Sequence, residues 1–459
     1  MATLKAVRGT RDLLPPETAL WNRIEATARQ VFARYNFGEI RTPIFEDTAL
    51  FARSVGEETD IVSKEMYTWE DRARAQSEKT QSLTLRPENT AGVVRAYIEH
   101  GLGESGQLQK LYYIGPQFRR ERPQKGRYRQ FWQIGAEVIG PPSSGSESPL
   151  RDAEVLEMLA TLLNELKIEG WTLELNSVGS AADREKYNDV LRAALVDVAP
   201  KMCGDCQRRA VTNPLRVLDC KVPEDQPIIE KLPRIGDSLG EDSKTHFSAV
   251  LAALDAVGVP YKLNQRLVRG LDYYTRTTFE FTHGGLGAQN ALLGGGRYDG
   301  LSEAIGGPKA PGIGFAIGLD RLVLTLQSQL VQNSASPQGT QVADAYIAPI
   351  GESLNAAALV LARELRNAGL RIEIGDGSFR LKKSFEAADK VARRIVILGE
   401  DEVRSGILTV KDFASGVQSK VPRSELAAMI AKLNGAHKNW KMQILRLRSL
   451  AAASDLRSG

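Results

Sequence analysis

Apolar residues recur at helical spacing in several parts of the chain. After the Pro-Pro pair at residues 15–16, they fall at Leu20, Ile24, Val31 and Tyr35. Three to four residues between apolar positions place them on one face of a helix. The pattern therefore predicts an amphipathic helix over 18–35, and similar patterns predict helices near 90–100 and 153–167.

Runs of aromatic and β-branched residues predict strands. The sequence GEIRTPIFE at 38–46 predicts one strand, and LVRGLDYYTRTTFEFTH at 267–283 predicts another. Between them, LQKLYYIGPQF at 108–118 and RYRQFWQIGAEVIG at 127–140 are joined by the turn residues Pro123, Lys125 and Gly126, which predicts a hairpin. We expect Arg119 to lie on a strand of this hairpin, 72–81 to be an exposed hairpin tip, and 141–148 to be a loop.

The chain has room for two or three domains. We expect a first domain over 1–328, with an inserted subdomain at about 181–259, where charged helical patterns surround three cysteines. Polar residues without apolar periodicity predict a linker at 329–341. Strand and helix patterns then alternate, which predicts a compact α/β domain with a mixed sheet over 342–435.

Charge is concentrated in a few places. The net charge is +4, and the tail at 436–459 carries five Lys or Arg against Asp455, so the first 435 residues are nearly neutral. Any polyanionic partner would be met by local patches. We expect the tail to form a basic helix or a disordered segment.

Three cysteines in 459 residues indicate a reducing compartment, for which the cytoplasm is the expectation. No apolar run approaches the roughly 20 residues that a membrane helix needs. The amino-terminal sequence has no apolar centre of the kind found in signal peptides. We expect no membrane partner and no DNA partner.

The predicted hairpin carries the densest charge. From Arg119 to Arg129 there are six cations and one carboxylate. Such a run is typical of a solvated loop or a nucleic-acid patch. The strands on either side favour another interpretation, because a guanidinium fixed on a sheet can bind phosphate or carboxylate through two parallel hydrogen bonds.

Two other segments suggest chemistry. In VRGLDYYTRTTFEF, strand alternation would put Arg269 and Tyr273 on one side and Tyr274 on the other unless a bulge intervenes, so the pocket-lining tyrosine stays open. The glycine-rich segments GGGRYDG at 294–300 and GIGFAIGLDRL at 312–322 predict tight turns and a closely packed strand and helix. Neither matches a P-loop or a dinucleotide-binding turn.

Together these segments resemble the histidyl-tRNA synthetases, a family of class II aminoacyl-tRNA synthetases, over nearly the whole chain. RTPIFE resembles the first class motif, with Pro43 at a homodimer interface; FRRERPQKGRYRQFWQIGAEV resembles the second, and GIGFAIGLDRL the third. TLRPENTAG and LVRGLDYY are similar to the histidine-specific segments. The resemblance implies an α+β fold, with an antiparallel catalytic sheet, a helical insertion and a carboxy-terminal α/β anticodon-binding domain.

The resemblance also implies a reaction in two steps. L-histidine and ATP, with Mg²⁺, would form histidyl-adenylate and pyrophosphate, and the histidyl group would then move to the 3′ end of tRNA(His). Arg119 and Arg269 would be the catalytic residues, approaching the α-phosphate from opposite sides. Further ATP contacts would come from Glu121, Arg127, Phe131 and Arg321, with Phe131 and Arg321 on either side of adenine.

Histidine itself would be read by polar groups at both ring nitrogens. The resemblance assigns one ring nitrogen to Glu88 and the other to the Tyr274 hydroxyl. The remaining histidine-binding residues would be Thr90, Gln133 and Glu137 at the α-amino group, Tyr298 at the pocket wall, Arg269 and Tyr273. The acceptor end of tRNA would meet Arg122, Gln124 and Arg129, and the basic segment at 381–390 would meet the anticodon.

Some features depart from the family or allow another interpretation. Asn89 and Trp132 stand where Gly and His are frequent in the family, so the resemblance does not fix the pocket shape or the tRNA-end contacts at these positions. Cys203, Cys206 and Cys220 suggest zinc or buried thiols, but no fourth ligand is near in sequence and His246 is the nearest histidine, so no metal is assigned. The alternative functions are a non-catalytic regulatory paralogue of histidine biosynthesis and a phosphate-handling enzyme without RNA contacts.

Overall fold

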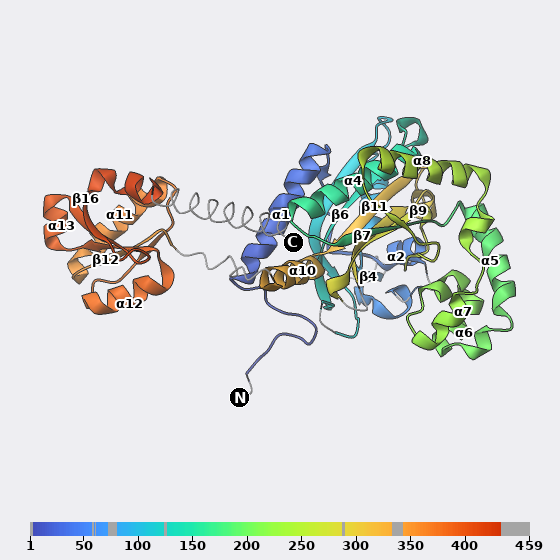
Figure 1. Ribbon diagram of the computed structural model, residues 1–459, viewed down its shortest axis with the longest axis horizontal. Coiled ribbons are helices and arrows are strands. Elements are labelled where there is room, and N and C mark those ends of the chain that lie inside the picture. Colours follow the sequence, from blue (N-terminus) through green and yellow to red (C-terminus); the bar gives the residue numbers. More distant parts are fainter. Residues whose placement is uncertain are drawn as a thin grey trace, which may run out of the picture. The chain divides into compact units, whose positions relative to one another are not determined.

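The computed structural model describes residues 3–56, 59, 61–71, 80–123, 126–286, 290–332 and 343–432 (Figure 1). The chain divides into two compact units, Met1–Gln338 and Gly339–Gly459. The predicted tail at 436–459 lies outside the described residues. Helix α10 continues to Gln332, so the first residues of the predicted linker at 329–341 are helical, and 333–341 lie outside the described residues.

The first unit is built on an eight-stranded sheet with the order β1-β5-β6-β11-β10-β9-β7-β8. The six central strands are antiparallel neighbours, whereas β1 pairs with β5 and β8 with β7 in parallel. The antiparallel core agrees with the predicted α+β class. In spatial order the strands span Gly38–Glu39, Gln109–Phe118, Gln130–Ile139, Gly312–Gly318, Ala291–Arg297, Thr275–His283, Trp171–Ser177 and Lys262–Leu263.

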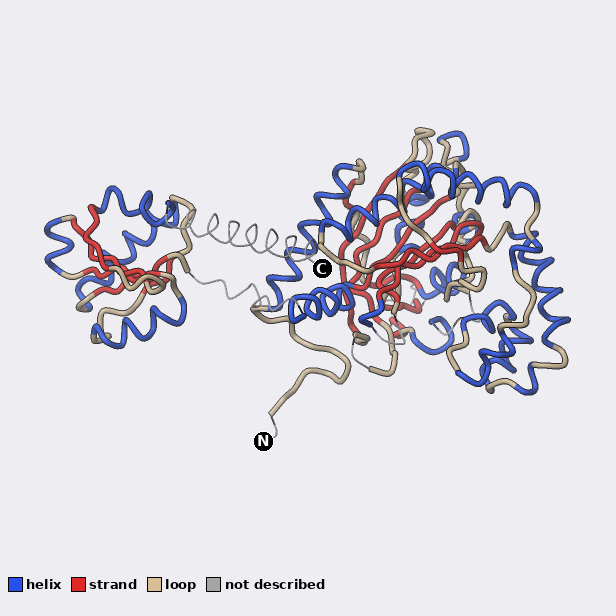
Figure 2. The backbone as a smooth tube through the Cα atoms, in the orientation of Figure 1, coloured by secondary structure: helices blue, strands red, loops and turns tan. Residues whose placement is uncertain are grey.

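Helices pack against this sheet (Figure 2). Apolar side chains of the helices and of the sheet are buried together in one cluster. The helices are α1 (Glu17–Arg34), α4 (Pro149–Glu165), α8 (Glu241–Val257) and α10 (Leu319–Gln332). Phe32 of α1 and Leu159 of α4 are fully buried in one cluster with Phe279 of β9. Each such side chain contributes about 1.5–3 kcal/mol on leaving water, so this cluster fixes the sheet that carries the site.

The predicted strand over 38–46 is interrupted. β1 ends at Glu39 and β2 (Phe45–Asp47) belongs to a separate sheet with β4 (Gln81–Leu85) and β3 (Tyr67–Asp71). Between them, Pro43 has no N–H to donate, and its carbonyl accepts from Arg86 Nη1 at 3.2 Å. β3 and β4 pair as a hairpin whose predicted tip lies largely outside the described residues.

The first unit also contains several shorter helices. They are α2 (Thr48–Val55), which Asp47 caps through the N–H of Ala49 at 2.8 Å, and η1 (Ile61–Glu65), α3 (Thr90–Glu99), η2 (Pro142–Ser144), η7 (Gly284–Leu286) and α9 (Leu301–Ala304). The predicted helices over 18–35, 90–100 and 153–167 correspond to α1, α3 and α4.

The inserted subdomain has its own apolar core, which contains Tyr187, Leu191, Cys206 and Ile235. Its helices are α5 (Ala181–Leu195), η3 (Ala199–Lys201), α6 (Gly204–Thr212), η4 (Pro214–Asp219), η5 (Pro223–Asp225), α7 (Gln226–Ile229) and η6 (Ile235–Ser238). The predicted subdomain at 181–259 also included α8. This helix instead buries Val250 and Leu254 in the core of the large sheet.

The second unit contains a five-stranded mixed sheet with the order β13-β12-β14-β15-β16. Its strands span Ile372–Ile374, Ala345–Pro349, Arg394–Leu398, Ile407–Asp412 and Gln418–Pro422, and its helices are η8 (Glu352–Leu354), α11 (Asn355–Asn367), α12 (Leu381–Val391), α13 (Glu400–Ser405) and η9 (Arg423–Glu425), with residues 426–432 also helical. The mixed sheet was predicted. β16 and α13 were missed, because both are short and largely exposed and so lack an apolar period.

Candidate active site

A cavity of about 970 Å³ in the first unit brings most of the predicted site residues together. It is lined by segments distant in sequence, including the charged hairpin, residues 264–274, β10, β11 and part of the inserted subdomain. The predicted residues on its wall are Glu88, Thr90, Arg119, Glu121, Arg127, Phe131, Gln133, Arg269, Tyr273, Tyr274, Tyr298 and Arg321.

Three further predicted site residues, Arg122, Arg129 and Glu137, do not line this cavity. Glu137 is fully buried behind it. Arg122 and Arg129 lie off the wall, and Arg129 is engaged with the amino-terminal segment, where its backbone N–H donates to Gly9 O at 2.7 Å. Gln124 lies outside the described residues.

Arg119 follows directly after β5. The expectation that it lies on the strand was wrong by one residue, since β5 ends at Phe118, although the backbone N–H of Arg119 still bonds to Arg129 O at 2.9 Å. Its side chain is held in two ways. Nε donates to Pro87 O at 2.9 Å, and the guanidinium lies 5.3 Å from the centre of the Phe131 ring. The remaining donors of the guanidinium are thereby oriented in the cavity.

A second group of charges lies beside Arg119. The carboxylate of Glu121 is 3.7 Å from Arg119 Nη1 and 3.3 Å from Arg127 Nη1. Arg321 donates from Nη1 to Ala291 O at 2.8 Å. Burial and the neighbouring positive charge of Arg127 lower the pKa of Arg321. Crowding of cations is favourable only if an anion joins them, so this part of the cavity suits a polyphosphate.

Arg269 lies in the segment between β8 and β9 and lines the same cavity as Arg119. Its guanidinium forms an ion pair with Glu280 of β9, and this pairing raises the pKa of Arg269 although burial acts to lower it. Gly294 is paired with Glu280 across the β9–β10 ladder. A Cβ at Gly294 would lie 2.6 Å from Arg269 Cζ, so a larger residue there would displace the guanidinium from this position.

Tyr273 and Tyr274 both line the cavity. The predicted strand over 267–283 begins only at Thr275, and the residues before it form turns, so strand alternation does not apply to them. The two rings are 4.8 Å apart between centroids, and the ring of Tyr298 lies 5.9 Å from that of Tyr273. The backbone departs from a strand here because it is held elsewhere, for example by Asp272 N–H to Val55 O at 3.3 Å.

Two buried carboxyl groups mark the inner end of the site. Glu88 accepts backbone N–H groups from Thr90 at 2.7 Å and Ala91 at 3.0 Å, at the start of α3. Burial raises the pKa of Glu88, opposed by those two N–H groups and by the charge of Arg119. The amino terminus of a helix favours an anion.

Glu137 lies one layer deeper. It accepts from Thr90 Oγ1 at 2.7 Å and from the Tyr298 hydroxyl at 2.6 Å. Burial raises its pKa to about 8. A Cβ at Gly314 would lie 1.6 Å from Glu137 Oε2, which explains a glycine at that position of β11.

Sequence reasoning missed two residues of this site. Tyr113 lines the cavity opposite Gly135, where a Cβ would come within 2.3 Å of its hydroxyl. Tyr113 lies six residues before Arg119, and residues an even number apart along a strand share one face. Strand alternation could therefore have identified Tyr113. Glu280 could not have been found in this way, because its role depends on the position of Arg269 outside any strand.

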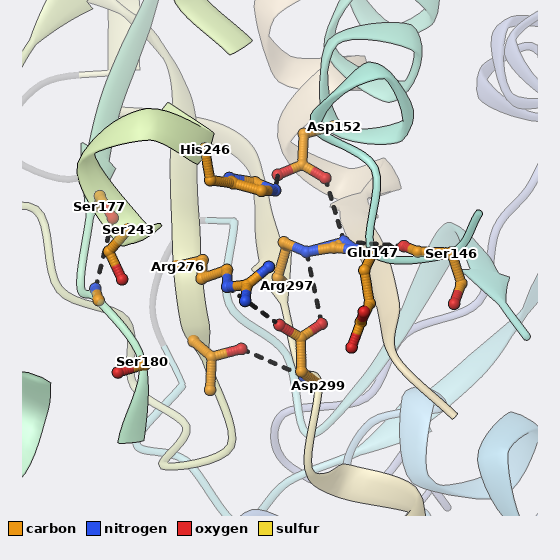
Figure 3. Close-up of polar contacts among 12 residues, drawn as sticks. Ser146, Glu147, Asp152, Ser177, Ser180, Ser243, His246, Arg276, Arg297 and Asp299 are labelled. Atoms are coloured by element: carbon orange, nitrogen blue, oxygen red, sulfur yellow. Dashed lines mark hydrogen bonds and ion pairs between the residues drawn. The ribbon is translucent and has the colours of Figure 1, made fainter. Parts of the chain in front are cut away.

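The two neighbours of Tyr298 in sequence, Arg297 and Asp299, belong to a polar network that also contains Asp152 and His246 (Figure 3). Arg297 is fully buried and lies 3.2 Å from Asp152 of α4 and 3.4 Å from Asp299. His246 of α8 approaches the other oxygen of Asp152 at 3.6 Å. Burial raises the pKa of Asp152 to about 6, whereas burial and the charge of Arg297 lower the pKa of His246 to about 3.

In the part of the chain that the structure describes, none of the helices combines the length and hydropathy needed to cross a bilayer.

Comparisons with known proteins identify relatives over both units. The family model described as histidyl-tRNA synthetase matches residues 9–322, and the anticodon binding domain model matches residues 344–433. The chain is 72% identical over 436 residues to a histidine–tRNA ligase of Koribacter versatilis, covering 95% of this chain and 97% of that protein. It is 54% identical over 429 residues to one of Solibacter usitatus, covering 93% of this chain and 99% of that protein.

Solved structures give the same picture. Apo histidyl-tRNA synthetase of S. aureus is 36% identical with a TM-score of 0.75, covering 93% of this chain and 100% of that one. A protein of Bacillus halodurans C titled as an ATP phosphoribosyltransferase regulatory subunit/histidyl-tRNA synthetase shares the fold with a TM-score of 0.62 at 18% identity, covering 87% of this chain and 99% of that one.

Proposed function

This chain belongs to the histidyl-tRNA synthetase family of class II aminoacyl-tRNA synthetases, and on that premise we propose how its residues activate histidine and charge tRNA. The chain is a histidine–tRNA ligase: it forms histidyl-adenylate from L-histidine and ATP and transfers the histidyl group to tRNA(His). The observation that carries the assignment of residues is one cavity in which Arg119 and Arg269 accompany a buried, tyrosine-lined carboxyl site.

Adenylation requires an oxygen of the histidine carboxylate to attack the α-phosphorus of ATP while pyrophosphate leaves. Both reactants are anions, so their repulsion opposes the step. Arg119 would bind the carboxylate and the α-phosphate, and Arg269 would bind the α-phosphate from the other side. Donors fixed before the reaction stabilise developing charge without reorganisation, and loss of one typically costs about 3–4 kcal/mol.

The cations Arg127 and Arg321 would bind the rest of ATP. Phe131 and Arg321 would enclose adenine, one with an aromatic face and the other with a cationic plane. Glu121, which neutralises part of this charge, would lie beside the nucleotide.

The residues present fit magnesium as a companion of ATP. In the described part of the chain no three acidic side chains gather closely enough to hold a metal on their own. Mg²⁺ takes one or two protein carboxylates and completes its shell with phosphate and water oxygens. Glu121 and Glu280 line the cavity and would supply such ligands, and a bound ion would neutralise charge on the phosphates.

The arrangement of the two carboxyl groups favours exchanging their predicted roles. In histidine the α-amino group is one bond from the carbon that carries the carboxylate, and the ring lies farther away. Glu88 lies near Arg119, which interacts with its charge and bonds to the adjacent Pro87. We therefore assign Glu88, with Thr90 and Gln133, to the α-amino group.

The ring would then extend towards the tyrosines. Tyr273, Tyr274 and Tyr298 line this end, with Glu137 behind Tyr298. The Tyr274 hydroxyl would address one ring nitrogen, and Glu137 would address the other directly or through Tyr298. Leaving these buried groups unpaired would reject other flat side chains.

Two further contacts are proposed for tRNA and for a second copy of the chain. The acceptor end would meet Arg122, Gln124 and Arg129, and α12, with Lys382 and Lys383 exposed, would meet the anticodon. Next to Pro43, the exposed aromatic side chains Phe45 and Trp69 lie 6.0 Å apart between ring centroids. Exposed aromatic residues are typical of interfaces, which supports a homodimer.

A direct test is histidine-dependent exchange of labelled pyrophosphate into ATP with magnesium. We expect exchange with histidine and none with other amino acids, followed by charging of total tRNA. A protein that binds histidine without any exchange would instead support the regulatory paralogue, against which the match to the anticodon binding domain already argues.

The assignment of Glu88 can be tested with Glu88→Gln and two ligands. We expect the substitution to weaken histidine binding by at least about tenfold, because a charged hydrogen bond contributes roughly 1.5–3 kcal/mol. Binding of imidazole propionate, which lacks the α-amino group, should change little, as should ATP binding. Equal weakening of both imidazole ligands would return Glu88 to the ring.

A further inference from the structure

We propose that the inserted subdomain contains a structural zinc site formed by Cys203, Cys206, Cys220 and Asp225. One ligand atom from each of these side chains lies within 4.8 Å of all the others. Cys206, Cys220 and Asp225 are buried, and Cys203 is partly exposed. The site is separate from the substrate groups assigned above.

The distances suit a tetrahedral ion. Cys203 Sγ and Cys220 Sγ are 3.9 Å apart, and Cys220 Sγ is 3.2 Å from Asp225 Oδ2. A tetrahedral zinc site with Zn–S bonds of about 2.3 Å places sulfurs roughly 3.8 Å apart. The sulfurs of Cys203 and Cys220 are therefore already at the separation that zinc requires and too far apart for a disulfide.

The proposed ligands are positioned by a helix start and by hydrogen bonds from backbone N–H groups. Cys203 is the N-cap of α6 and Cys206 lies in its first turn, so the C-x-x-C pair is presented by a helix start. The N–H of Val222 donates to Cys220 Sγ at 3.4 Å, and the N–H of Cys203 donates to Asp225 at 3.1 Å. N–H groups aimed at sulfur and carboxylate favour the deprotonated ligands that a metal needs.

The fourth ligand was missed because it was sought among histidines. The imidazole of His246 is committed to the network around Asp152. Asp225 is five residues beyond Cys220 and is 2% exposed, which is unusual for a carboxylate. Three thiolates and one carboxylate around a small tetrahedron favour zinc over magnesium or calcium, which prefer oxygen ligands and higher coordination numbers.

The site would fix one wall of the active-site cavity. Asp219, Cys220 and Lys221 line that cavity. In the same segment, Arg216 Nη1 donates to the backbone carbonyl of Arg269 at 3.2 Å. A metal that holds Cys220 would help to fix the segment that contains Arg216. Through the hydrogen bond from Arg216, it would also help to position the backbone of Arg269, whose guanidinium is proposed to be catalytic.

Without a metal, the same residues would be two buried thiols and one partly exposed thiol beside a buried carboxylate. The two arrangements differ in metal content, thiol reactivity and spectrum. They can be distinguished whether or not the proposed catalytic roles are correct, because none of these measurements involves histidine, ATP or tRNA.

The experiment uses the full-length protein, reduced and reconstituted with Zn²⁺ or Co²⁺ and then freed of loosely bound metal. We expect one equivalent of metal per chain and, with Co²⁺, the thiolate charge-transfer and ligand-field bands of tetrahedral coordination. The three thiols should react slowly with a disulfide reagent while zinc is bound and rapidly after its removal by a strong chelator.

Asp225→Asn and Asp205→Asn form a matched pair of variants. Asp205 lies between the cysteines but is largely exposed and pairs with Arg208 at 2.8 Å. We expect Asp225→Asn to lose zinc to a chelator at least about tenfold faster, with Asp205→Asn unchanged. Equal retention of zinc by both variants would overturn the proposal. Wild-type protein that binds no metal and has three freely reactive thiols would also overturn it. The wild-type measurements remain valid even if Asp225→Asn does not fold.

Discussion

At the scale of single residues, the site depends on charges that are held before substrate arrives. Arg119 is fixed by Pro87 and Phe131, and Arg269 by Glu280. A guanidinium whose direction is already fixed loses little conformational entropy on binding phosphate. Preorganisation of this kind accounts for how a few side chains could lower the barrier between two anions.

Arg269→Ala tests this directly. We expect the fold to be kept and the rate of histidine-dependent pyrophosphate exchange to fall by at least about 100-fold, since one preorganised donor is worth about 3 kcal/mol. Arg269→Lys should recover only part of the rate, because lysine keeps the charge but not the two parallel donors.

Arg192→Ala is a suitable control for the loss of an arginine. Arg192 pairs with Asp189 at 3.2 Å on the surface of α5 and should be silent in the exchange assay. A near-normal rate in Arg269→Ala would rule out the proposed catalytic role.

At the scale of elements, a buried ionic network connects α4, α8 and the end of β10 (Figure 3). Tyr298, which lines the cavity, directly follows Arg297 of this network. Removing one partner of a buried pair costs about 3–5 kcal/mol, because the other charge is left uncompensated. The network therefore ties the pocket wall to the core of the large sheet.

His246→Gln makes a pH-dependent prediction. The folded pKa of His246 is about 3, below the ordinary value of 6.5. As pH falls from 6.5 towards 3, the unfolded chain takes up a proton there and the folded chain does not, so His246 lowers the free energy of unfolding. Between pH 7.5 and 5, the resulting decrease in the free energy of unfolding is at most about 2 kcal/mol. In His246→Gln this decrease should be absent.

The comparison must be made at matched pH because Asp152 acts in the opposite direction. Its folded pKa of about 6 lies above the ordinary value of 3.8, so its contribution to stability rises as pH falls from about 6 to 4. Denaturant unfolding of both proteins at pH 7.5 and 5 measures the difference. If the free energy of unfolding falls equally in wild type and variant between pH 7.5 and 5, His246 is protonated in the folded state.

At the scale of the whole molecule, the two units have separate cores. The second unit buries Leu361, Val396 and Leu408 in a cluster of its own, with no member from the first unit. In a chain organised in this way, we expect adenylation to depend on the first unit and anticodon contacts to depend on the second.

Leu361→Ala separates these activities. Leu361 is 1% exposed, and Leu→Ala in a core costs about 2–5 kcal/mol. We expect the second unit to unfold at lower denaturant concentration and tRNA charging to fall, with pyrophosphate exchange unchanged. Parallel loss of charging and exchange would mean that the units are not independent in function.

Sequence periodicity alone determined the parts of this protein that depend on neighbours along the chain. A helix period placed α1, α3 and α4, and strand patterns placed the charged hairpin that holds Arg119 and Phe131. The motifs of the family then identified the histidyl-tRNA synthetases and an α+β catalytic sheet, both of which the comparisons confirm. The roles of individual site residues stay predictions.

Only the tertiary structure decided which distant residues meet. The turns before Thr275 bring both Tyr273 and Tyr274 to the cavity, Gly294 admits Arg269 beside Glu280, and Asp225 joins the three cysteines. None of these has a signature in periodicity, because a period reports the face of an element and not its partner across space. The physical reason is packing: a side chain lies where the surrounding backbone leaves room, and that room is made by segments far away in the sequence.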